Sequence, residues 1–349
     1  MSHLLEEAPF GPREEAVFLE EANTLTRHHL DGCAVYARVW HECQPARRVE
    51  DLPFLHVGVF KHVEFKTAAA GIRHERTLKS SATTSGTASR ILLDAQSSQF
   101  QSQSTSAILK DFLGDSRRPL LVLDGSKSLQ QRGEVSARVA AALSLRPLAS
   151  DIVFLLDDAE NPASMNWPRL QCILEGHEEL LVYGFTWMLW LAWGQMEKPE
   201  AIRRLLAGKQ IHFVHSGGWK KLEAMKVGRD QFGSALLQNL NPGSRVLDFY
   251  GLVEQAGIIY PLCESGFRHV PRWAEVIVRD PFTLRSLSGG ETGLLQLINT
   301  LAWGAPYHSV LTEDLGRLEP GSCPCGRSGK RFELLGRVPK AEMRGCANV

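Results

Sequence analysis

The sequence lacks an excess of charge of either sign, because 39 lysines and arginines balance 39 aspartates and glutamates over 349 residues. It also lacks a block of basic residues, so nothing in the charge pattern supports a general role in binding nucleic acid or membrane surfaces. The most apolar stretch, Leu180 to Trp193, is too short to cross a bilayer core of about 30 Å. We therefore expect no nucleic-acid partner and no membrane span.

The N-terminus lacks the features of a signal peptide, since Met1 to Phe10 carries acidic residues and has no basic, then apolar, then small-residue order. Seven cysteines are an odd number in a chain of this size, which argues against a disulfide framework. These observations predict a cytoplasmic protein in a reducing compartment. Some of its cysteines would then be available for metal binding or for chemistry.

Apolar, β-prone runs alternate with stretches compatible with helices, which predicts an α/β layered fold with ligands near the carboxyl ends of the strands. The first helix is expected within Glu14 to Trp40, where apolar residues recur at helical spacing. Strands are expected around residues 91–93, 120–123, 152–156, 211–214, 245–248 and 274–278, and helices within 133–149, 178–193, 201–207 and 218–240. The Ser-, Thr- and Gln-rich segment 80–106 is expected to form loop, strand and loop.

The segment Thr83-Thr84-Ser85-Gly86-Thr87 has the composition of a phosphate-binding loop. Glycine permits positive φ and a close approach of the backbone, while hydroxyl and backbone N–H groups donate hydrogen bonds to phosphate oxygens. The glycine spacing and the Gly-Lys-Ser/Thr ending of a Walker loop are missing. On its own the segment is equally compatible with a Ser/Thr-rich surface turn.

Further motifs follow in a fixed order: Ser216-Gly217-Gly218, Asp248-Phe249-Tyr250-Gly251-Leu252-Val253-Glu254, Gly290-Glu291-Thr292-Gly293, Thr312-Glu313-Asp314-Leu315 and Gly336-Arg337. In this order and spacing they resemble the core motifs of the adenylate-forming superfamily, from about residue 60 to the end. Four segments resemble more narrowly the acyl-protein synthetase (LuxE-like) family, which is related to the phenylacetate–CoA ligases. They are Val57 to Lys61, His215 to Lys221, Gly266 to Trp273 and Glu342 to Cys346.

The resemblance implies the layered large-domain fold of adenylate-forming enzymes without their usual mobile C-terminal domain. We expect an N-terminal helical segment over residues 1–60, the core domain over 61–336 and a C-terminal tail over 337–349 with an acyl-accepting cysteine. The lysine that the mobile domain usually supplies has no counterpart in this sequence. Lys220 or Lys221 is a candidate substitute, and an exposed lysine at the start of a helix is the alternative interpretation.

The resemblance also implies roles for individual residues in binding ATP and Mg²⁺. Thr83 to Thr87 would hold the β- and γ-phosphates, and Glu254 would hold Mg²⁺. Gly217 and Gly218 would let the backbone approach adenine, and Tyr250 and its neighbour Gly251 would pack at the adenine. Asp314 would bind the ribose hydroxyls, and Arg337 would lie near the ribose or α-phosphate. Asp314 lies in Thr312-Glu313-Asp314, where the superfamily usually has Thr-Gly-Asp. Singly, these residues could instead cap a helix, lie on the surface or pack in the core.

Cys263, His269, Cys323 and Cys325 have the spacing of a metal site, Cys-x5-His followed by Cys-Pro-Cys-Gly. Three thiolates and one imidazole make a tetrahedral zinc site, and the tight Cys-Pro-Cys-Gly turn suits two of them. The phenylacetate–CoA ligase relatives resemble this in carrying zinc. We favour a structural zinc ion over the alternative of ordinary buried thiols and a surface histidine.

Cys346 lies near the C-terminus beside Arg344, whose charge would lower the pKa of its thiol. Because the resembling family carries its acyl group on a C-terminal cysteine, Cys346 is assigned as the acyl carrier, with an inert terminal cysteine as the alternative. The predicted function is ATP-dependent activation of a carboxylic acid, with a fatty acid favoured, as acyl-AMP and transfer to Cys346. The acyl group would then pass to a partner acyl reductase or another acyl-acceptor protein.

Two other functions remain open on the sequence alone. The chain could be an acyl- or aryl-CoA ligase, or a ligase that loads a carrier protein, with Cys346 uninvolved. It could also be a non-catalytic, zinc-bearing relative that binds nucleotide only. The aromatic stretch Tyr183 to Trp193 is interpreted as a buried core helix that could also line an apolar channel for the acid.

Overall fold

The computed structural model describes residues 3–80, 87–126 and 134–338. These residues form two compact units. Unit 1 contains the described residues among 1–82, 87–104 and 252–349, and unit 2 contains those among 105–251. Within the described ranges no helix has both the length and the apolar character needed to cross a membrane.

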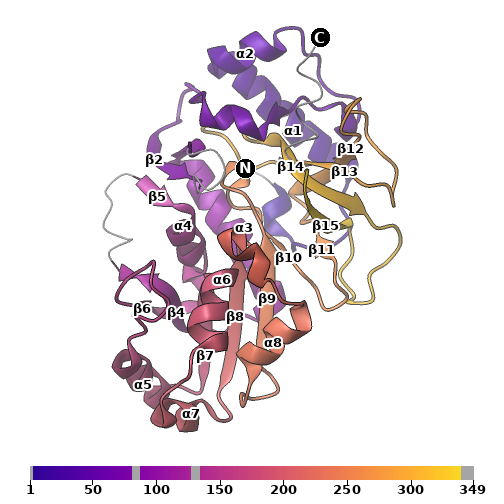
Figure 1. The fold of residues 1–349 in the computed structure, drawn as a ribbon. Helices are drawn as coiled ribbons and strands as arrows, with labels where there is room; N and C mark the ends of the chain where they lie inside the picture. Colours follow the sequence, from indigo (N-terminus) through magenta and orange to yellow (C-terminus); the bar gives the residue numbers. More distant parts are fainter. Residues whose placement is uncertain (1–2, 81–86, 127–133, 339–349) are drawn as a thin grey trace. The chain divides into compact units, whose positions relative to one another are not determined.

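A parallel sheet forms the centre of unit 2. Its strands β6 (Ala149–Leu156), β4 (Arg118–Gly125), β7 (Glu179–Phe185), β8 (Gln210–Ser216) and β9 (Arg245–Tyr250) lie side by side in this order (Figure 1). Every residue of β4 is buried, as expected for a parallel strand covered on both faces. The unit also contains β5 (Glu134–Ser136) and the helices α4 (Ala137–Ser144), α5 (Trp167–Gly176), α6 (Thr186–Leu189), α7 (Glu200–Leu206) and α8 (Arg229–Leu237).

One sequence prediction in unit 2 is wrong, because the helix expected over residues 178–193 begins only at Thr186. Its first half is the strand β7, which lies between β4 and β8 in the sheet, with Tyr183 in register with Val122 and Val214. The second half is α6 followed by a π-helical turn, Trp190–Gln195. A continuous apolar run fits a buried strand and a buried helix equally well, so periodicity could not separate them.

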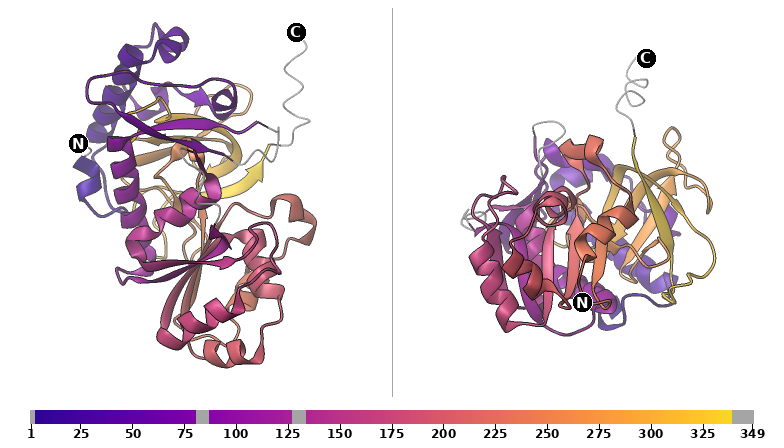
Figure 2. Two further views of the ribbon diagram at one scale, coloured as in Figure 1. Left: turned by 90° about the vertical axis from the view of Figure 1, so that its left-hand side faces the viewer. Right: turned by 60° about the horizontal axis from the view of Figure 1, so that its bottom comes forward.

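An antiparallel sheet forms the centre of unit 1. Its strands β11 (Arg268–His269), β15 (Arg331–Arg337), β14 (Ser309–Leu318), β13 (Gly293–Asn299) and β12 (Ala274–Arg279) follow in this order, and β1 (Leu55–His56) runs parallel to β14. Strand β15 can be followed in yellow beside the darker β14 in the left view of Figure 2. Unit 1 also contains the short strand β10 (Tyr260–Pro261) and a separate antiparallel pair, β2 (His74–Lys79) and β3 (Arg90–Asp94).

The N-terminal helix predicted within residues 14–40 is confirmed, with one interruption. It comprises α1 (Glu15–Gly32) and α2 (Ala34–Trp40), separated by Cys33, whose φ of −127° and ψ of 97° are extended. The buried face of α1 includes Phe18, Ala22 and Leu25. Unit 1 also contains the short 3-10 helices η1 (His3–Glu6), η3 (Val57–Lys61) and η8 (Val253–Gln255).

A second sequence prediction is wrong, because the loop expected after residue 93 is the long helix α3 (Ala95–Leu113). The Asp94 carboxylate accepts hydrogen bonds from the backbone N–H groups of Gln96 and Ser97 and so caps the helix N-terminus. Polar residues dominate its first half, but Phe100, Ile108 and Leu109 are buried. Tertiary packing therefore overrides a composition that favours turns.

Candidate functional site

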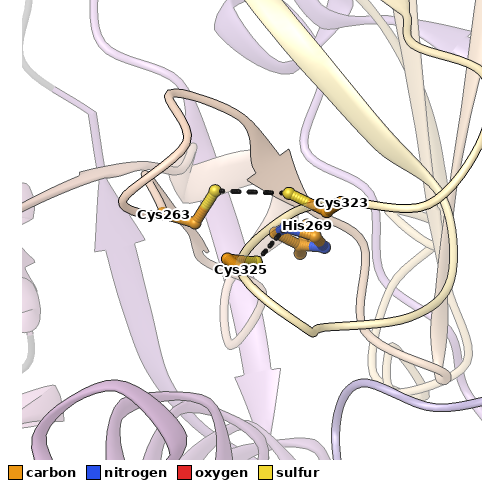
Figure 3. Close-up of side chains that lie close together, drawn as sticks. All are labelled: Cys263, His269, Cys323 and Cys325. Carbon is orange, nitrogen blue, oxygen red and sulfur yellow. Dashed lines mark hydrogen bonds between the residues drawn. The ribbon is translucent and has the colours of Figure 1, made fainter.

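Three groups of residues in the described ranges carry chemistry, and each lies within one unit. The first comprises Cys263, His269, Cys323 and Cys325 in unit 1, called here the Cys/His cluster (Figure 3). Cys263 follows β10, His269 ends β11, and the two other cysteines lie in the turn between β14 and β15. Pairing of β11 with β15, with His269 opposite Arg331, holds the two loops together.

The ligand atoms of the Cys/His cluster surround a common centre. All four lie within 4.8 Å of one another, with 3.8 Å between the Sγ atoms of Cys263 and Cys323 and 3.2 Å from Cys325 Sγ to His269 Nε2. A tetrahedral zinc ion with Zn–S bonds of about 2.3 Å places its sulfurs about 3.8 Å apart. The donor set and its spacing therefore fit a four-coordinate zinc ion that leaves no position open for substrate.

The protonation state of the Cys/His cluster would change on metal binding. Burial raises the pKa of the Cys263 thiol to about 11, so without a cation this buried thiol stays protonated at neutral pH. A zinc ion would remove that proton, since coordinating thiols bind as thiolates. The N-terminal segment covers the cluster, with the Phe10 ring edge-on to His269 at 5.8 Å and the Arg327 guanidinium 6.0 Å from the Phe10 ring.

The second group comprises Glu254, Asp314 and Arg337, also in unit 1. Asp314 and Arg337 are cross-strand neighbours on β14 and β15, and Arg337 Nε donates to Asp314 Oδ1 at 2.9 Å. Asp314 is 6 % exposed, while the Arg337 side chain is 57 % exposed. The carboxylate is thus held at the strand surface by a cation that reaches solvent.

Glu254 lies on η8 with only 5 % of its surface exposed. Burial raises the pKa of its carboxyl group, while the nearby Ser89 side chain and the positive charges of Lys61 and Arg337 act in the opposite direction. Ser89 immediately precedes β3, and η3, which ends at Lys61, packs against both β3 and β14. A buried acid among hydroxyl and cationic groups suits the binding of a cation together with an anionic ligand.

The third group lies at the carboxyl ends of β7, β8 and β9 in unit 2. Gly217 and Gly218 follow β8 with φ of 82° and 61°, a left-handed turn that favours glycine at both positions. Tyr250 ends β9 and is 9 % exposed, and the next residue, Gly251, is exposed. The carboxyl edge of a parallel sheet is where ligands bind in such folds.

A polar network occupies the same edge and received no role from the sequence. Thr186 Oγ1 lies 3.0 Å from His215 Nδ1 and 3.2 Å from the Ser216 carbonyl oxygen, and His215 Nδ1 lies 3.8 Å from Asp248 Oδ1. Tyr183 Oη lies 3.3 Å from Ser216 Oγ. The available signal was the position of His215-Ser216 at the end of a buried strand, directly before a glycine pair.

A small cavity lies beside this edge, between β4, α4 and the β7–α6 junction. It measures about 10 Å³, enough for one water molecule, and is lined by Asp124, Arg138, Tyr183, Trp187 and Met188 among others. Trp190 and Trp193 instead pack against Phe232 and Phe213. The aromatic stretch therefore both fills the core of unit 2 and contributes to a cavity wall.

The remaining candidate residues are placed only in part. Thr83, Thr84, Ser85 and Gly86 and the cysteine Cys346 lie outside the described residues, while Thr87 lies at their edge and is exposed. The backbone of Lys220 begins a 3-10 helix, Lys220–Met225. The candidate nucleotide residues divide between the units, with Glu254, Asp314 and Arg337 in unit 1 and the glycines and Tyr250 in unit 2.

Comparison with known proteins gives a family match across most of the chain. The family described as "Acyl-protein synthetase, LuxE" matches residues 13–349. A long-chain-fatty-acid–luciferin-component ligase of Vibrio harveyi is 30% identical over 144 residues, which are 40% of this chain and 36% of that protein. The ligase of the same description from Aliivibrio fischeri is 27% identical, over 40% of this chain and 37% of its own. This chain thus matches little more than a third of the length of each of these two curated relatives.

Solved structures show which fold this is. A 2-hydroxyisobutyryl-CoA ligase crystallised in an open conformation with 2-HIB-AMP and CoA has a TM-score of 0.68 and 16% identity, and the match covers 93% of this chain and 75% of that one. The same ligase in its postadenylation state with 2-HIB-AMP has a TM-score of 0.68 and 18% identity, over 95% and 70% of the two chains. The expected α/β fold of adenylate-forming ligases is confirmed.

Proposed function

The chain belongs to the acyl-protein synthetase (LuxE) family, and on this basis we propose that it activates a carboxylic acid with ATP and then carries the acyl group on a thiol. In the first step the acid's carboxylate attacks the α-phosphate, giving acyl-AMP and pyrophosphate. In the second step a thiol displaces AMP. The acid is a long-chain fatty acid, as the descriptions of the curated relatives suggest.

The buried carboxylate of Glu254 is the observation that carries this proposal. An acid that is 5 % exposed and lies beside Ser89, Lys61 and Arg337 is costly to keep unless it binds a cation or a donor. Glu254 would hold Mg²⁺, which would neutralise charge on the phosphate oxygens. Asp314 would accept hydrogen bonds from the ribose hydroxyls, and Arg337 would lie near the ribose or α-phosphate.

The other roles follow from the same assignment. Thr83 to Thr87 would bind the β- and γ-phosphates, and Gly217, Gly218, Tyr250 and Gly251 would enclose the adenine. Lys220 would supply the catalytic lysine. The Cys/His cluster would hold a structural zinc ion, which the fit of its four ligand atoms supports.

Cys346 would accept the acyl group as a thioester and present it to a partner acyl reductase or another acyl-acceptor protein. This assigns the three predicted segments distinct tasks. Residues 61–336 carry out adenylation, residues 337–349 carry the product, and residues 1–60 form a helical support. Reduced thiols and the absence of a predicted membrane span suit a cytoplasmic setting for this exchange.

ATP–pyrophosphate exchange measured across a panel of fatty and aromatic acids tests the activation step. Wild-type protein should exchange label with fatty acids, and Glu254→Gln should lower the rate by about 100-fold or more, the range typical for a lost electrostatic contact to the reacting phosphates. Glu175→Gln, which alters an exposed acid on α5, is the matched control. Exchange that is absent with every acid, or unaffected by Glu254→Gln, would contradict the proposal.

Labelling with radioactive acid and ATP tests the transfer step. The wild-type chain should become labelled in a form that hydroxylamine releases, as expected for a thioester. Cys346→Ser should abolish this label, whereas Cys172→Ser, a change of an exposed cysteine on α5, should not. Equal labelling of wild type and Cys346→Ser would remove Cys346 from the pathway, and transfer to coenzyme A instead would identify a CoA ligase.

A further inference from the structure

A short N-terminal segment, residues 7–13, lies against the Cys/His cluster of unit 1 and is called here the strap. It contains no helix or strand, and its prolines at positions 9 and 12 have no backbone N–H group to donate. The Phe10 ring lies edge-on to the His269 imidazole, with 5.8 Å between the ring centroids. The Arg327 guanidinium, from the turn between β14 and β15, lies 6.0 Å from the same ring. One aromatic side chain thus lies beside both segments that would hold zinc.

Arg272 fastens the strap at this place. Its backbone N–H donates to the Pro9 carbonyl oxygen at 2.9 Å, and its guanidinium pairs with the Glu7 carboxylate. Gly11 packs directly on the guanidinium, since a Cβ atom at this position would clash with Nη2. Arg272 follows His269 by three residues, so the strap is held next to a candidate zinc ligand.

The C-terminal end of the strap is anchored by Arg13. Its guanidinium donates to the carbonyl oxygens of Arg272 and Ala274 and, at 2.6 Å, to the Glu275 carboxylate. The Glu275 side chain is fully buried and also pairs with Lys330 at 2.8 Å. Breaking one partner out of a buried ion pair is costly. Arg13 should therefore stay in place when the residues before it move.

The bonds before Arg13 are weaker than those that hold the cluster ligands. The Glu7 side chain is 56 % exposed, so solvent screens its ion pair. The ligand segments are instead joined by backbone hydrogen bonds, from Cys263 to Phe267 and between β11 and β15. Segments with few backbone hydrogen bonds open locally at a lower free energy than the whole fold. The strap should therefore open while the ligands stay in position.

We propose that residues 7–12 form a lid over the zinc site and control how fast the ion enters and leaves. Cys263, His269 and Cys323 are buried, and Cys325 is half-buried, so the closed strap leaves the ion little access to solvent. Movement of Phe10 would uncover His269. This inference rests on the zinc site of the proposed function and adds a kinetic control to it.

A lid has a signature that distinguishes it from a support for the ligands. The strap supplies no ligand atom to the Cys/His cluster. Loosening it should therefore speed zinc binding and zinc release by similar factors and leave the affinity nearly unchanged, since an equilibrium shifts only by a difference in binding between its states. A residue that holds His269 in position would instead change the affinity.

Transfer of zinc from the full-length, zinc-loaded protein to a chromophoric chelator tests the proposal. In Phe10→Ala, release should be about 10-fold faster, because the variant loses an aromatic edge contact and a cation–π contact. The affinity, measured by equilibrium competition with the same chelator, should stay within about threefold of wild type. Phe10→Leu keeps an apolar side chain over His269 and should give an intermediate rate. Phe282→Ala, which removes an exposed ring elsewhere in unit 1, is the control.

Glu7 gives a second test at the other side of the lid. Glu7→Gln removes the ion pair with Arg272 and should speed release about two- to threefold at low ionic strength, the effect expected for an exposed pair. The difference from wild type should disappear at 1 M salt, which screens exposed charges. Glu6→Gln changes the neighbouring exposed acid and should release zinc at the wild-type rate.

Two results would overturn the lid without affecting the zinc site. Phe10→Ala could release zinc at the wild-type rate, or its affinity could fall in proportion to its faster release, in which case Phe10 positions His269. Wild-type protein that is folded but holds no zinc would overturn the zinc site and the lid together. Activation of the acid by ATP is a separate measurement and decides neither.

Discussion

The Cys/His cluster of unit 1 and the carboxyl edge of unit 2 use similar side chains in opposite ways. In the cluster, four ligand atoms face one another within 4.8 Å, and a single cation would use all of them. At the edge, the polar atoms bond to one another instead, and Thr186 Oγ1 lies between His215 Nδ1 and the Ser216 carbonyl oxygen. The first arrangement suits a closed metal site, whereas the second uses its polar atoms to join neighbouring elements of the unit.

The largest expected effect would come from replacing one ligand of the Cys/His cluster. Cys323→Ser should release zinc and lower the free energy of unfolding by more than about 4 kcal/mol, because loss of a metal ligand is among the few single changes of that size. The effect should appear as loss of zinc in metal analysis together with a lower denaturant midpoint. Cys33→Ser changes a buried cysteine outside the cluster and serves as the control. Purified wild-type protein that is folded but zinc-free would refute the assignment.

The ion pair between Asp314 and Arg337 could serve either nucleotide binding or stability, and a variant of Asp314 distinguishes the two roles. Asp314→Asn should raise the KM for ATP by roughly 10- to 100-fold in the exchange assay, the equivalent of hydrogen bonds between a charged group and the ribose. The melting temperature should change little, since the Arg337 side chain is 57 % exposed and screened by solvent.

A neighbouring ion pair offers the matched control for Asp314→Asn. Arg317 on β14 bonds to Glu333 on β15 at 2.6 Å, in the same two strands. Arg317→Gln should leave the KM for ATP unchanged. A large loss of stability in Asp314→Asn with an unaltered KM would place the Asp314–Arg337 pair with the structural features instead.

The sequence allowed prediction of those parts of the molecule that local spacing encodes. The turn Cys323-Pro324-Cys325 and the pair Cys263 and His269 could be grouped because metal ligation needs few residues at short separations. The strands around residues 120–123, 152–156 and 211–214 were predicted because buried parallel strands are continuous apolar runs. The adenylate-forming fold followed from motif order rather than from composition.

Features created by neighbours in space could not be predicted from the sequence. Strand β7 differs from a helix only because β4 and β8 flank it, and α3 is helical because its few apolar residues pack inward. The tautomer of His215 depends on Thr186, 29 residues earlier, whose hydroxyl proton is directed to a backbone carbonyl group. No local pattern encodes that combination.

Two buried histidines of unit 1, His29 and His308, should make the free energy of unfolding decrease as the pH falls. Burial lowers the pKa of His308 to about 3, and burial followed by the nearby His308 and His28 lowers that of His29 well below 6.5. Both stay neutral in the folded state and take up protons on unfolding. Each should therefore reduce the free energy of unfolding by about 1.4 kcal/mol per pH unit as the pH falls below 6.5.

Urea unfolding of wild type and His308→Gln between pH 6.5 and 5 measures this effect. The slope of stability against pH should be smaller in His308→Gln by about 1 kcal/mol per pH unit on average over this range, approaching 1.4 kcal/mol per pH unit at its acid end. Protonation of the cluster ligands affects both proteins equally and cancels in the difference. His41→Gln, a change of an exposed histidine elsewhere in unit 1, should leave the slope unaltered. Identical slopes for wild type and His308→Gln would mean that His308 is not neutral in the fold.

The smallest expected effect concerns Tyr183, which contacts the carboxyl edge of the parallel sheet in unit 2. Its hydroxyl lies 3.3 Å from Ser216 Oγ, a long bond between neutral groups, and its ring stays buried in Tyr183→Phe. Stability should fall by about 1 kcal/mol or less, and acyl-AMP and thioester formation should both stay within about threefold of wild type. A larger loss of either step in Tyr183→Phe would show that the hydrogen bond to Ser216 contributes to the reaction.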